Sequence, residues 1–360
     1  MIKTIFMSLA ALLFAPTLTV SAAEGTLNIG DNAPALTVKQ WVKGDAVTGF
    51  EKNKFYVVEF WATWCGPCKM SIPHLTEMQK AHPDVTFIGV SVWEKDQAKV
   101  QPFVDKMGDK MVYRVAMDSI ADGEKTGKMA AAWMEAAGEG GIPTAFIIDK
   151  AGKIAWIGHP MGMEEPLGQI LAGKWDSAAA AKTRADEKAM DKLLEDLGQK
   201  IGESMQAGDT KAALAAIDEA LRTTPKIEEK VGPTKIKIML DAKSYDDAYA
   251  YAGKLVDKVL WNNADGLNYV AWMLVDPDAT LEKRDAKLAL RAALRASSLK
   301  SDKDPSMLDT LATAYALSGD NAKAIETQTK AVELAKGTPQ AKQLQERLDQ
   351  LKKGTSKSGS

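Results

Sequence analysis

Cys65 and Cys68 are the two cysteines of this 360-residue chain, and only Gly66 and Pro67 lie between them. A pair at this spacing can close a small disulfide ring and exchange it with an external thiol. The alternatives are a structural disulfide or half of a zinc site. A closed zinc site needs four ligands, and the chain offers three histidines and no second cysteine pair. The spacing therefore favours thiol–disulfide exchange.

The cysteine pair lies between a predicted strand and a predicted helix. Residues 55–61 are aromatic and β-branched, and residues 69–80 follow with helical spacing. Apolar positions for the inner face of this helix are Met70, Leu75 and Met78. The first turn of a helix carries unpaired N–H groups and about half a positive charge, which stabilise a thiolate. We therefore expect Cys65 to attack a substrate and Cys68, one turn further along, to resolve the mixed disulfide.

Two segments resemble the thioredoxin family. Residues 59–69, with the sequence Glu-Phe-Trp-Ala-Thr-Trp-Cys-Gly-Pro-Cys-Lys, resemble its active-site segment, and residues 141–149, Gly-Ile-Pro-Thr-Ala-Phe-Ile-Ile-Asp, resemble its cis-proline strand. Pro143 follows Cys68 by 75 residues, more than in a minimal thioredoxin. This spacing is similar to the extracytoplasmic TlpA-like and redoxin-like branch, whose inserted element would here include residues 133–137. The resemblance covers about residues 27–172.

The resemblance implies roles for individual residues. Cys65 would be the nucleophile and Cys68 the resolving thiol, with Pro143 in a cis peptide bond beside them. Glu59 would be a buried acid that takes the proton of Cys68, unless it is an edge-exposed strand residue. Many TlpA-like proteins have an acid where Ser71 stands here, so tuning by that acid is not assumed. Residues expected to shape a substrate groove are Trp61, Trp64, Gly66, Pro67, Ile142 and Thr144. No metal and no cofactor is expected.

The amino terminus has the pattern of a signal peptide. Met1-Ile2-Lys3 precedes an apolar stretch from Ile5 to Val20, which ends in the small residues Ser21-Ala22-Ala23. We expect cleavage after residue 23 and a periplasmic or secreted protein; an uncleaved anchor is the alternative. In such a compartment the dithiol would need a membrane electron-donor thiol protein to keep it reduced.

Composition bounds the class of protein. The 46 Lys and Arg residues nearly balance 48 Asp and Glu residues, giving a net charge of −2. Because no basic cluster stands out, we expect no nucleic-acid partner. The 46% hydrophobic and 26% charged residues are ordinary for a globular protein, and the length exceeds a usual single core.

Strand and helix patterns alternate between residues 85 and 158, which predicts an α/β thioredoxin-like sandwich with a mixed central sheet. We assign residues 24–172 to this domain. Beyond Trp175 the chain is rich in Ala, Lys and acidic residues and has no strand-like segment. We expect a linker at 173–185, an all-α domain at 186–352 and a disordered tail at 353–360.

The predicted all-α domain contains a repeating pattern. After a Gly-Asp turn, small residues stand seven apart at Ala213 and Ala220 and again at Ala324 and Ala331. Ala289 and Ala296 repeat this spacing 35 residues before the last pair, which indicates a period near 34. This pattern resembles tetratricopeptide repeats, in which paired helices stack into a solenoid that can bind a protein partner. A generic helical bundle is the alternative.

Together these patterns predict an extracytoplasmic protein thiol-disulfide oxidoreductase whose helical repeats select the partner. Gly66-Pro67 matches the intervening pair of reducing thioredoxins, so we expect reduction of protein disulfides. One rival is a redoxin-type thiol peroxidase, which needs a proline ahead of the reactive cysteine; Thr63 is present, but residues 60–64 contain no proline. A repeat-based scaffold protein is another. A copper chaperone using His159, Met161 and Met163 is a further alternative.

Overall fold

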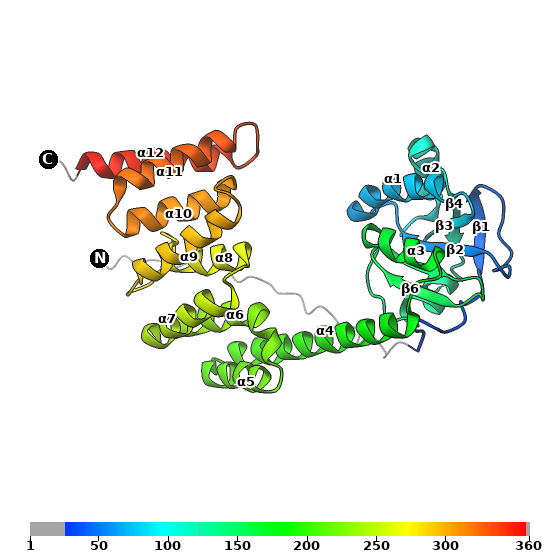
Figure 1. Ribbon diagram of the computed structural model, residues 1–360, viewed down its shortest axis with the longest axis horizontal. Helices are drawn as coiled ribbons and strands as arrows, with labels where there is room; N and C mark the ends of the chain where they lie inside the picture. Colours follow the sequence, from blue (N-terminus) through cyan, green and yellow to red (C-terminus); the bar gives the residue numbers. More distant parts are fainter. Residues whose placement is uncertain (1–25, 122, 358–360) are drawn as a thin grey trace, which may run out of the picture. The chain divides into compact units, whose positions relative to one another are not determined.

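The computed structural model describes residues 26–121 and 123–357; the expected signal peptide lies outside them. The chain divides into two compact units, one ending at Ala189 and the other beginning at Met190, and both are drawn in Figure 1. Within the described ranges, no helix combines the length and the apolar character needed to cross a membrane.

A six-stranded sheet forms the centre of the first unit (Figure 1). Its strands, in chain order, are β1 (Val38–Lys43), β2 (Phe55–Trp61), β3 (Val85–Ser91), β4 (Arg114–Asp118), β5 (Thr144–Ile148) and β6 (Ile154–Gly158). They lie in the order β1-β4-β3-β2-β5-β6, with β2 parallel to β3 and antiparallel to β5. The predicted mixed sheet of a thioredoxin-like domain is confirmed. Strand β1 was not predicted, because it is a partly exposed edge strand whose sequence includes Lys39 and Gln40.

Helices cover both faces of this sheet. They are α1 (Gly66–Ala81), α2 (Val100–Met107), α3 (Glu164–Leu171), a π-helix (Ala130–Glu135) and 3₁₀ turns at Gln97–Lys99, Gly108–Lys110 and Pro160–Gly162. Because side chains alternate along a strand, Val57 and Trp61 of β2 face a core shared with α1, α2 and α3. Tyr56, Val58 and Phe60 face a second core, which includes the π-helix.

The buried face of α1 differs from the predicted one at Met70. Cys68, Leu75 and Met78 are buried, as is Ile72, whereas Met70 is 72% exposed. Met70 follows Cys68 by two positions, which turns it to the opposite side of the helix. The prediction of Met70 on the inner face is therefore wrong.

The π-helix is anchored by a buried carboxylate at the end of β4. Asp118 accepts the backbone N–H of Met129 at 2.8 Å and that of Ala130 at 3.0 Å. A Cβ on Gly127 would collide with this carboxylate. Asp118 thus satisfies N–H groups that a helix start leaves without backbone partners.

The structure has a helix where a linker was expected. Helix α4 (Ser177–Gln206) begins after Asp176, whose carboxylate accepts the N–H of Ala178 and Ala179. The alanine-rich start has high helix propensity. Further along, Arg184 donates to the carbonyl of Ala137 at 2.9 Å and pairs with Glu139. This part of α4 belongs to the first unit, which ends at Ala189. Only residues 173–176 of the expected linker are not helical.

The second unit is all-α, as predicted. After the end of α4 its helices are α5 (Thr210–Thr223), α6 (Glu228–Asp241), α7 (Tyr245–Lys254) with a π-helical end (Leu255–Val259), α8 (Ala264–Val275), α9 (Ala286–Leu299), α10 (Pro305–Leu317), α11 (Asn321–Leu334) and α12 (Ala341–Lys357), with a 3₁₀ turn at Pro225–Ile227. Consecutive helices from α8 to α12 pack together, and α8 also contacts α6 and α10; Figure 1 shows the stack. Helix α12 continues past residue 352, where the tail was expected to begin.

The small residues of the repeat pattern lie at helix contacts. Ala289 and Ala296 of α9 are fully buried, as are Ala324 and Ala331 of α11. Alanine is small, so two helix backbones can approach closely where it lies. Two alanines seven residues apart therefore mark the side of the helix against which a neighbouring helix packs.

Candidate active site

The two cysteines form a disulfide at the start of α1. The S–S distance is 1.99 Å and the Cα–Cα distance is 5.3 Å. Cys65 is the N-cap residue of α1, and its Sγ accepts the backbone N–H of Cys68 at 3.1 Å. Cys65 keeps a small exposed area, whereas Cys68 has none. An incoming thiol therefore reaches Cys65, where the N-terminal end of the helix stabilises a thiolate.

The loop before β5 lies against Cys65. The peptide bond between Ile142 and Pro143 is cis, and the carbonyl oxygen of Ile142 is 3.6 Å from Sγ of Cys65. Pro143 itself is buried. The hydroxyl of Thr144 donates to the carbonyl of Gly141 at 2.8 Å, which holds the loop closed. The fold thus brings together two segments 77 residues apart.

The residues expected in a substrate groove divide into two sets. Trp64 is 55% exposed; Gly66 and Pro67 are exposed and Ile142 is half-buried, so these four surround the disulfide at the surface. Trp61 and Thr144 are buried. The alternation of β2 turns Trp61 into the core, where its ring centroid is 5.2 Å from that of Phe103. Trp61 and Thr144 therefore support the groove from beneath and do not line it.

Glu94, which the sequence did not single out, fixes the segment ahead of the cysteines. Its carboxylate accepts the N–H of Thr63 at 2.5 Å, the hydroxyl of Thr63 at 2.7 Å and the hydroxyl of Ser91 at 3.0 Å. The indole N–H of Trp64 donates to the carbonyl of Trp93 at 3.1 Å. Trp93 has a φ of 54°, which non-glycine residues seldom adopt. The sequence feature that could have pointed to Glu94 is its position as an acidic residue shortly after the buried strand β3.

A surface pocket adjoins this segment. It has a volume of about 570 Å³ and is lined by Thr63, Trp64, Trp93, Glu94, Lys95, Asp96 and Lys99. The pocket extends the surface around the disulfide toward two tryptophans and two lysines, which gives the active-site surface both aromatic and charged contacts for a peptide segment.

Glu59 is buried in β2, which excludes the edge-exposed interpretation. It is 2% exposed, and among the described residues neither carboxylate oxygen has a hydrogen-bond partner. Its neighbours two positions away, Val57 and Trp61, belong to the core that contains Cys68. Alternation along the strand places Glu59 on this same side, beneath α1. Burial raises the pKa of Glu59 to about 8, so near neutral pH its carboxyl can both hold and release a proton.

The residues considered for copper do not converge. Nδ1 of His159 accepts the N–H of Met161 at 3.2 Å and thereby caps a 3₁₀ turn. Met163 is fully buried in the core beside α3, while Met161 is largely exposed. In the part of the chain that the structure describes, no group of three or more His, Cys, Asp or Glu side chains could hold a metal ion.

Comparison with known proteins gives the following matches. The Redoxin family model matches residues 28–165. Protein FixW of Rhizobium leguminosarum is 28% identical over 213 residues, 56% of this chain and 93% of that protein. Thiol-disulfide oxidoreductase ResA of Bacillus anthracis is 32% identical over 136 residues, 37% of this chain and 70% of that protein. A solved thiol-disulfide isomerase from Corynebacterium glutamicum aligns at 21% identity with a TM-score of 0.35, covering 40% of this chain and 97% of that one.

Replacement of Glu59 by leucine should remove a pH dependence of stability. Burial raises the pKa of Glu59 from 4.5 to about 8, so between these values the folded protein holds a proton that the unfolded chain has released. The stability of the native protein therefore falls as pH rises through this window. We expect the stability advantage of Glu59→Leu to grow by about 3 kcal/mol between pH 5 and pH 8, measured by urea unfolding of the oxidised proteins.

The matched control is Glu77→Leu, which replaces an exposed carboxylate on α1. Its stability difference from the native protein should be the same at both pH values. If Glu59→Leu behaved in this way too, the carboxyl of Glu59 would titrate normally in the folded state.

Proposed function

The chain belongs to the TlpA-like, redoxin branch of the thioredoxin superfamily and is a protein thiol-disulfide oxidoreductase, and on this premise we propose that it reduces protein disulfides outside the cytoplasm. The observation that carries the proposal is the position of Cys65. It caps α1, keeps the exposed edge of the disulfide, and lies 3.6 Å from the carbonyl of Ile142. A sulfur that is accessible at a helix N-terminus can attack a protein disulfide as a thiolate. The adjacent start of β5 offers backbone groups with which an extended substrate peptide can pair.

The reaction consists of two exchange steps. In the reduced protein, the thiolate of Cys65 attacks one sulfur of the substrate disulfide, which forms a Cys65–substrate disulfide and releases the other substrate sulfur as a thiolate. Cys68 then loses its proton and attacks Sγ of Cys65. The Cys65–Cys68 bond forms, the bond to substrate breaks, and the second substrate thiolate leaves. The substrate gains two electrons and two protons, and the protein ends in the disulfide form described above.

Glu59 accepts the proton of Cys68 in the second step. Cys68 is buried, so its thiol cannot exchange a proton freely with bulk water. Glu59 lies on the same side of β2 as the core that contains Cys68, and burial raises its pKa to about 8. A carboxylate with that pKa is closer to the pKa of a thiol than an ordinary one, which favours proton transfer between them.

The direction and the compartment rest on sequence features. Gly66 and Pro67, between the cysteines, match the reducing thioredoxins, and the signal-peptide pattern of residues 1–23 supports a periplasmic or secreted location. In that compartment a reductase needs a supply of electrons, for which a membrane thiol protein is the donor. The copper chaperone receives no support, because Met163 lies in the core.

The reduction potential of the Cys65–Cys68 pair tests the direction. We expect a value near that of thioredoxin, about −270 mV, because a dithiol with a low reduction potential donates electrons readily to substrate disulfides. The measurement equilibrates the full mature chain in dithiothreitol buffers and traps free thiols. A potential near about −120 mV, typical of a strong oxidant, would reverse the assignment to disulfide formation.

Serine variants of the two cysteines test the order of attack. Cys65→Ser should abolish insulin disulfide reduction, because it removes the accessible sulfur. Cys68→Ser should retain the first step and accumulate a Cys65–substrate mixed disulfide, since nothing then resolves it. Non-reducing electrophoresis with mass spectrometry reads both outcomes. An adduct formed by Cys65→Ser through Cys68 would contradict the order, and two fully active variants would favour the scaffold alternative.

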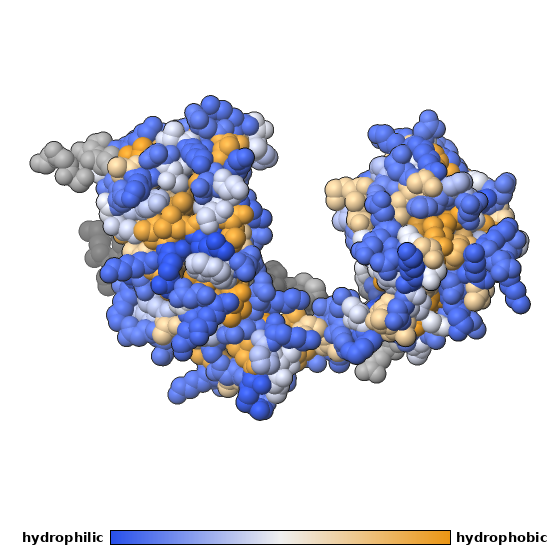
Figure 2. Space-filling model, in the orientation of Figure 1, coloured by the Kyte–Doolittle hydropathy of each residue, from blue (hydrophilic) through white to orange (hydrophobic). Residues whose placement is uncertain are grey.

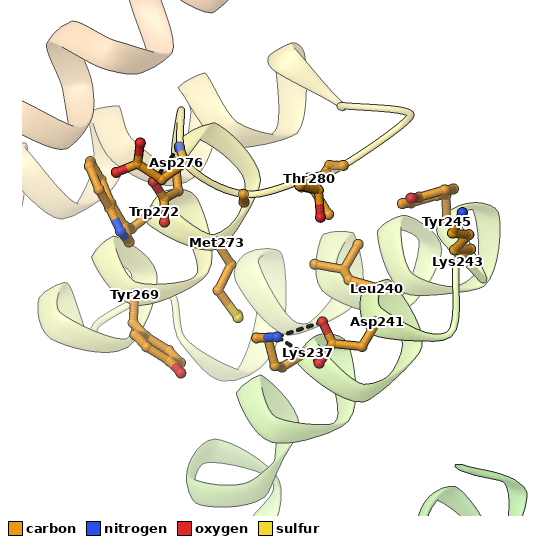
Figure 3. A pocket seen from close by; sticks show the side chains of 13 residues that line it. Lys237, Leu240, Asp241, Lys243, Tyr245, Tyr269, Trp272, Met273, Asp276 and Thr280 are labelled. Carbon is orange, nitrogen blue, oxygen red and sulfur yellow. Dashed lines mark hydrogen bonds and ion pairs between the residues drawn. The ribbon is translucent and has the colours of Figure 1, made fainter. Parts of the chain in front are cut away.

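We also propose that the helical unit is tetratricopeptide-like and selects the partner protein. A pocket of about 470 Å³ lies between α6, α8 and the loop after α8 (Figure 3). Tyr269 is half-exposed at this pocket, and the charged pair Lys237 and Asp241 lies across it from Met273. On the face shown in Figure 2, apolar residues emerge in bands between hydrophilic ones in this unit. An aromatic contact with charged groups around it is a common arrangement for binding a peptide.

Tyr269→Ala tests partner selection. In the Cys68→Ser background, which retains mixed disulfides, it should lower the yield of trapped natural substrates several-fold, because a lost aromatic anchor weakens binding. By itself it should leave insulin reduction unchanged, since Tyr269 is outside the thioredoxin-like unit. The matched control is Leu334→Ala, which removes another exposed apolar side chain on α11. In the same background, Leu334→Ala should leave the yield unchanged. Equal adduct yields for Cys68→Ser alone, with Tyr269→Ala and with Leu334→Ala would exclude this pocket as the selecting surface.

A further inference from the structure

Three buried side chains beneath the active site have polar atoms without partners. Their atoms that lack a hydrogen-bond partner among the described residues are Oε1 and Oε2 of Glu59, Nε1 of Trp61 and the hydroxyl oxygen of Tyr113. All three residues are at most 2% exposed. Buried polar groups are nearly always hydrogen-bonded, to protein atoms or to internal water. We call Glu59, Trp61 and Tyr113 the Glu59 cluster.

Gly89 is the point at which the cluster converges. It lies on β3, directly opposite Glu59 in the parallel register. A Cβ built on Gly89 would lie 2.9 Å from Cε2 of Tyr113, 3.2 Å from Nε1 of Trp61 and 3.3 Å from Oε2 of Glu59. Because Gly89 has no side chain, the phenol ring, the indole N–H and the carboxyl can all approach the same space beside this residue.

Among the residues that the structure describes, the neighbours of Glu59 named below supply hydrogen-bond donors but no cation. Its partners in the sheet are Gly89 on β3 and Ala145 on β5, and neither titrates. Helix α1 contributes Cys68 to the same core, and the segment before β4 contributes Tyr113. Burial and, to a smaller extent, the nearby Glu59 raise the pKa of Tyr113. Its hydroxyl therefore stays protonated and can donate a hydrogen bond. Trp61 offers one further N–H.

We propose that Tyr113 is a positioning residue for Glu59 in the exchange reaction. The Tyr113 hydroxyl and the Trp61 indole donate hydrogen bonds to the ionised carboxylate of Glu59, directly or through one internal water. They thereby stabilise and orient the form that takes the proton from Sγ of Cys68. The inference rests on the proposed function, because it refines the proton transfer that precedes attack of Cys68 on Cys65. The step transfers a proton and changes no oxidation state: the S–H bond breaks and leaves its electron pair on sulfur, and an O–H bond forms on Glu59.

The position of Tyr113 in the fold explains how it reaches this site. It stands one residue before β4, which the sheet order places on the far side of β3 from β2. Its ring crosses β3 only because Gly89 leaves room. A hydrogen bond to a charged acceptor is stronger in the low-dielectric interior than in bulk water, so a single donor here changes the ionisation of Glu59 measurably.

The test is the titration of Glu59 in oxidised full-length protein, where neither cysteine titrates. Carboxyl ¹³C NMR follows the native protein and Tyr113→Phe, with Glu59→Gln to assign the signal. Since the phenol favours the charged carboxylate, Tyr113→Phe should raise the pKa of Glu59 above its native value by about one pH unit. The matched control, Tyr56→Phe, removes a buried hydroxyl from the opposite face of the same strand and should leave the titration unchanged.

A kinetic readout separates positioning from packing. Rapid-mixing measurements of the resolution step should show the pH profile of Tyr113→Phe displaced upward by the same amount, with a rate up to about tenfold lower at pH 7 and a smaller difference at high pH. Circular dichroism and thermal unfolding check the fold. As a second variant, Trp61→Phe, which lacks the indole N–H, should displace the titration in the same direction.

A shift in Tyr113→Phe below about 0.3 unit would overturn the inference, as would an equal shift in Tyr56→Phe. The titration needs no substrate, so it is independent of the proposed function. If the native protein failed to reduce any protein disulfide while Tyr113→Phe still shifted Glu59, the function would be refuted and the hydrogen-bonded cluster would stand.

Discussion

The pairing of β2 with β5 is the constraint on which the active site depends. Antiparallel register places Phe60 opposite Thr144 and Glu59 opposite Ala145. The chain that leaves β2 therefore enters the cysteine turn beside the chain that enters β5 from the cis-proline loop. Neither segment alone places a carbonyl next to Cys65; backbone hydrogen bonds between two distant strands do so. A slip of one residue would turn every side chain of β2 to the other face of the sheet.

The same strand also buries a carboxyl beneath the disulfide. An unpaired carboxyl in an apolar core costs stability, most of all when ionised. In Glu59 this cost appears as a pKa raised to about 8, a value suited to exchanging protons with a thiol. The chain thus tolerates a local loss of stability at the place where proton transfer is needed, while Val57 and Trp61 on either side keep the strand packed.

Charged side chains fix several irregular segments of the first unit through hydrogen bonds and an ion pair. Glu94 accepts two hydrogen bonds from Thr63, before the cysteines, and one from Ser91 at the end of β3. Asp118 caps the π-helix on the other face of the sheet. Arg184 of α4 joins Glu139 and the carbonyl of Ala137 just beyond that helix. In each case a charged side chain satisfies backbone groups or a partner of opposite charge, so irregular segments keep one conformation.

The resemblance to the thioredoxin family implied the cis-proline at Pro143. Local sequence determined the features that depend on neighbouring residues: the Cys65–Cys68 spacing, the strand before it and the helix after it. These follow from propensity, capping and short motifs. Tertiary structure alone decided which side chains are buried or in contact. The structure chooses between the two interpretations of Glu59, which lies in the core, and it places Trp61 beneath the groove. The ring of Tyr113 and the carboxyl of Glu59 both lie beside Gly89. Such outcomes depend on strand register and on residues far apart in the chain, which no local pattern encodes.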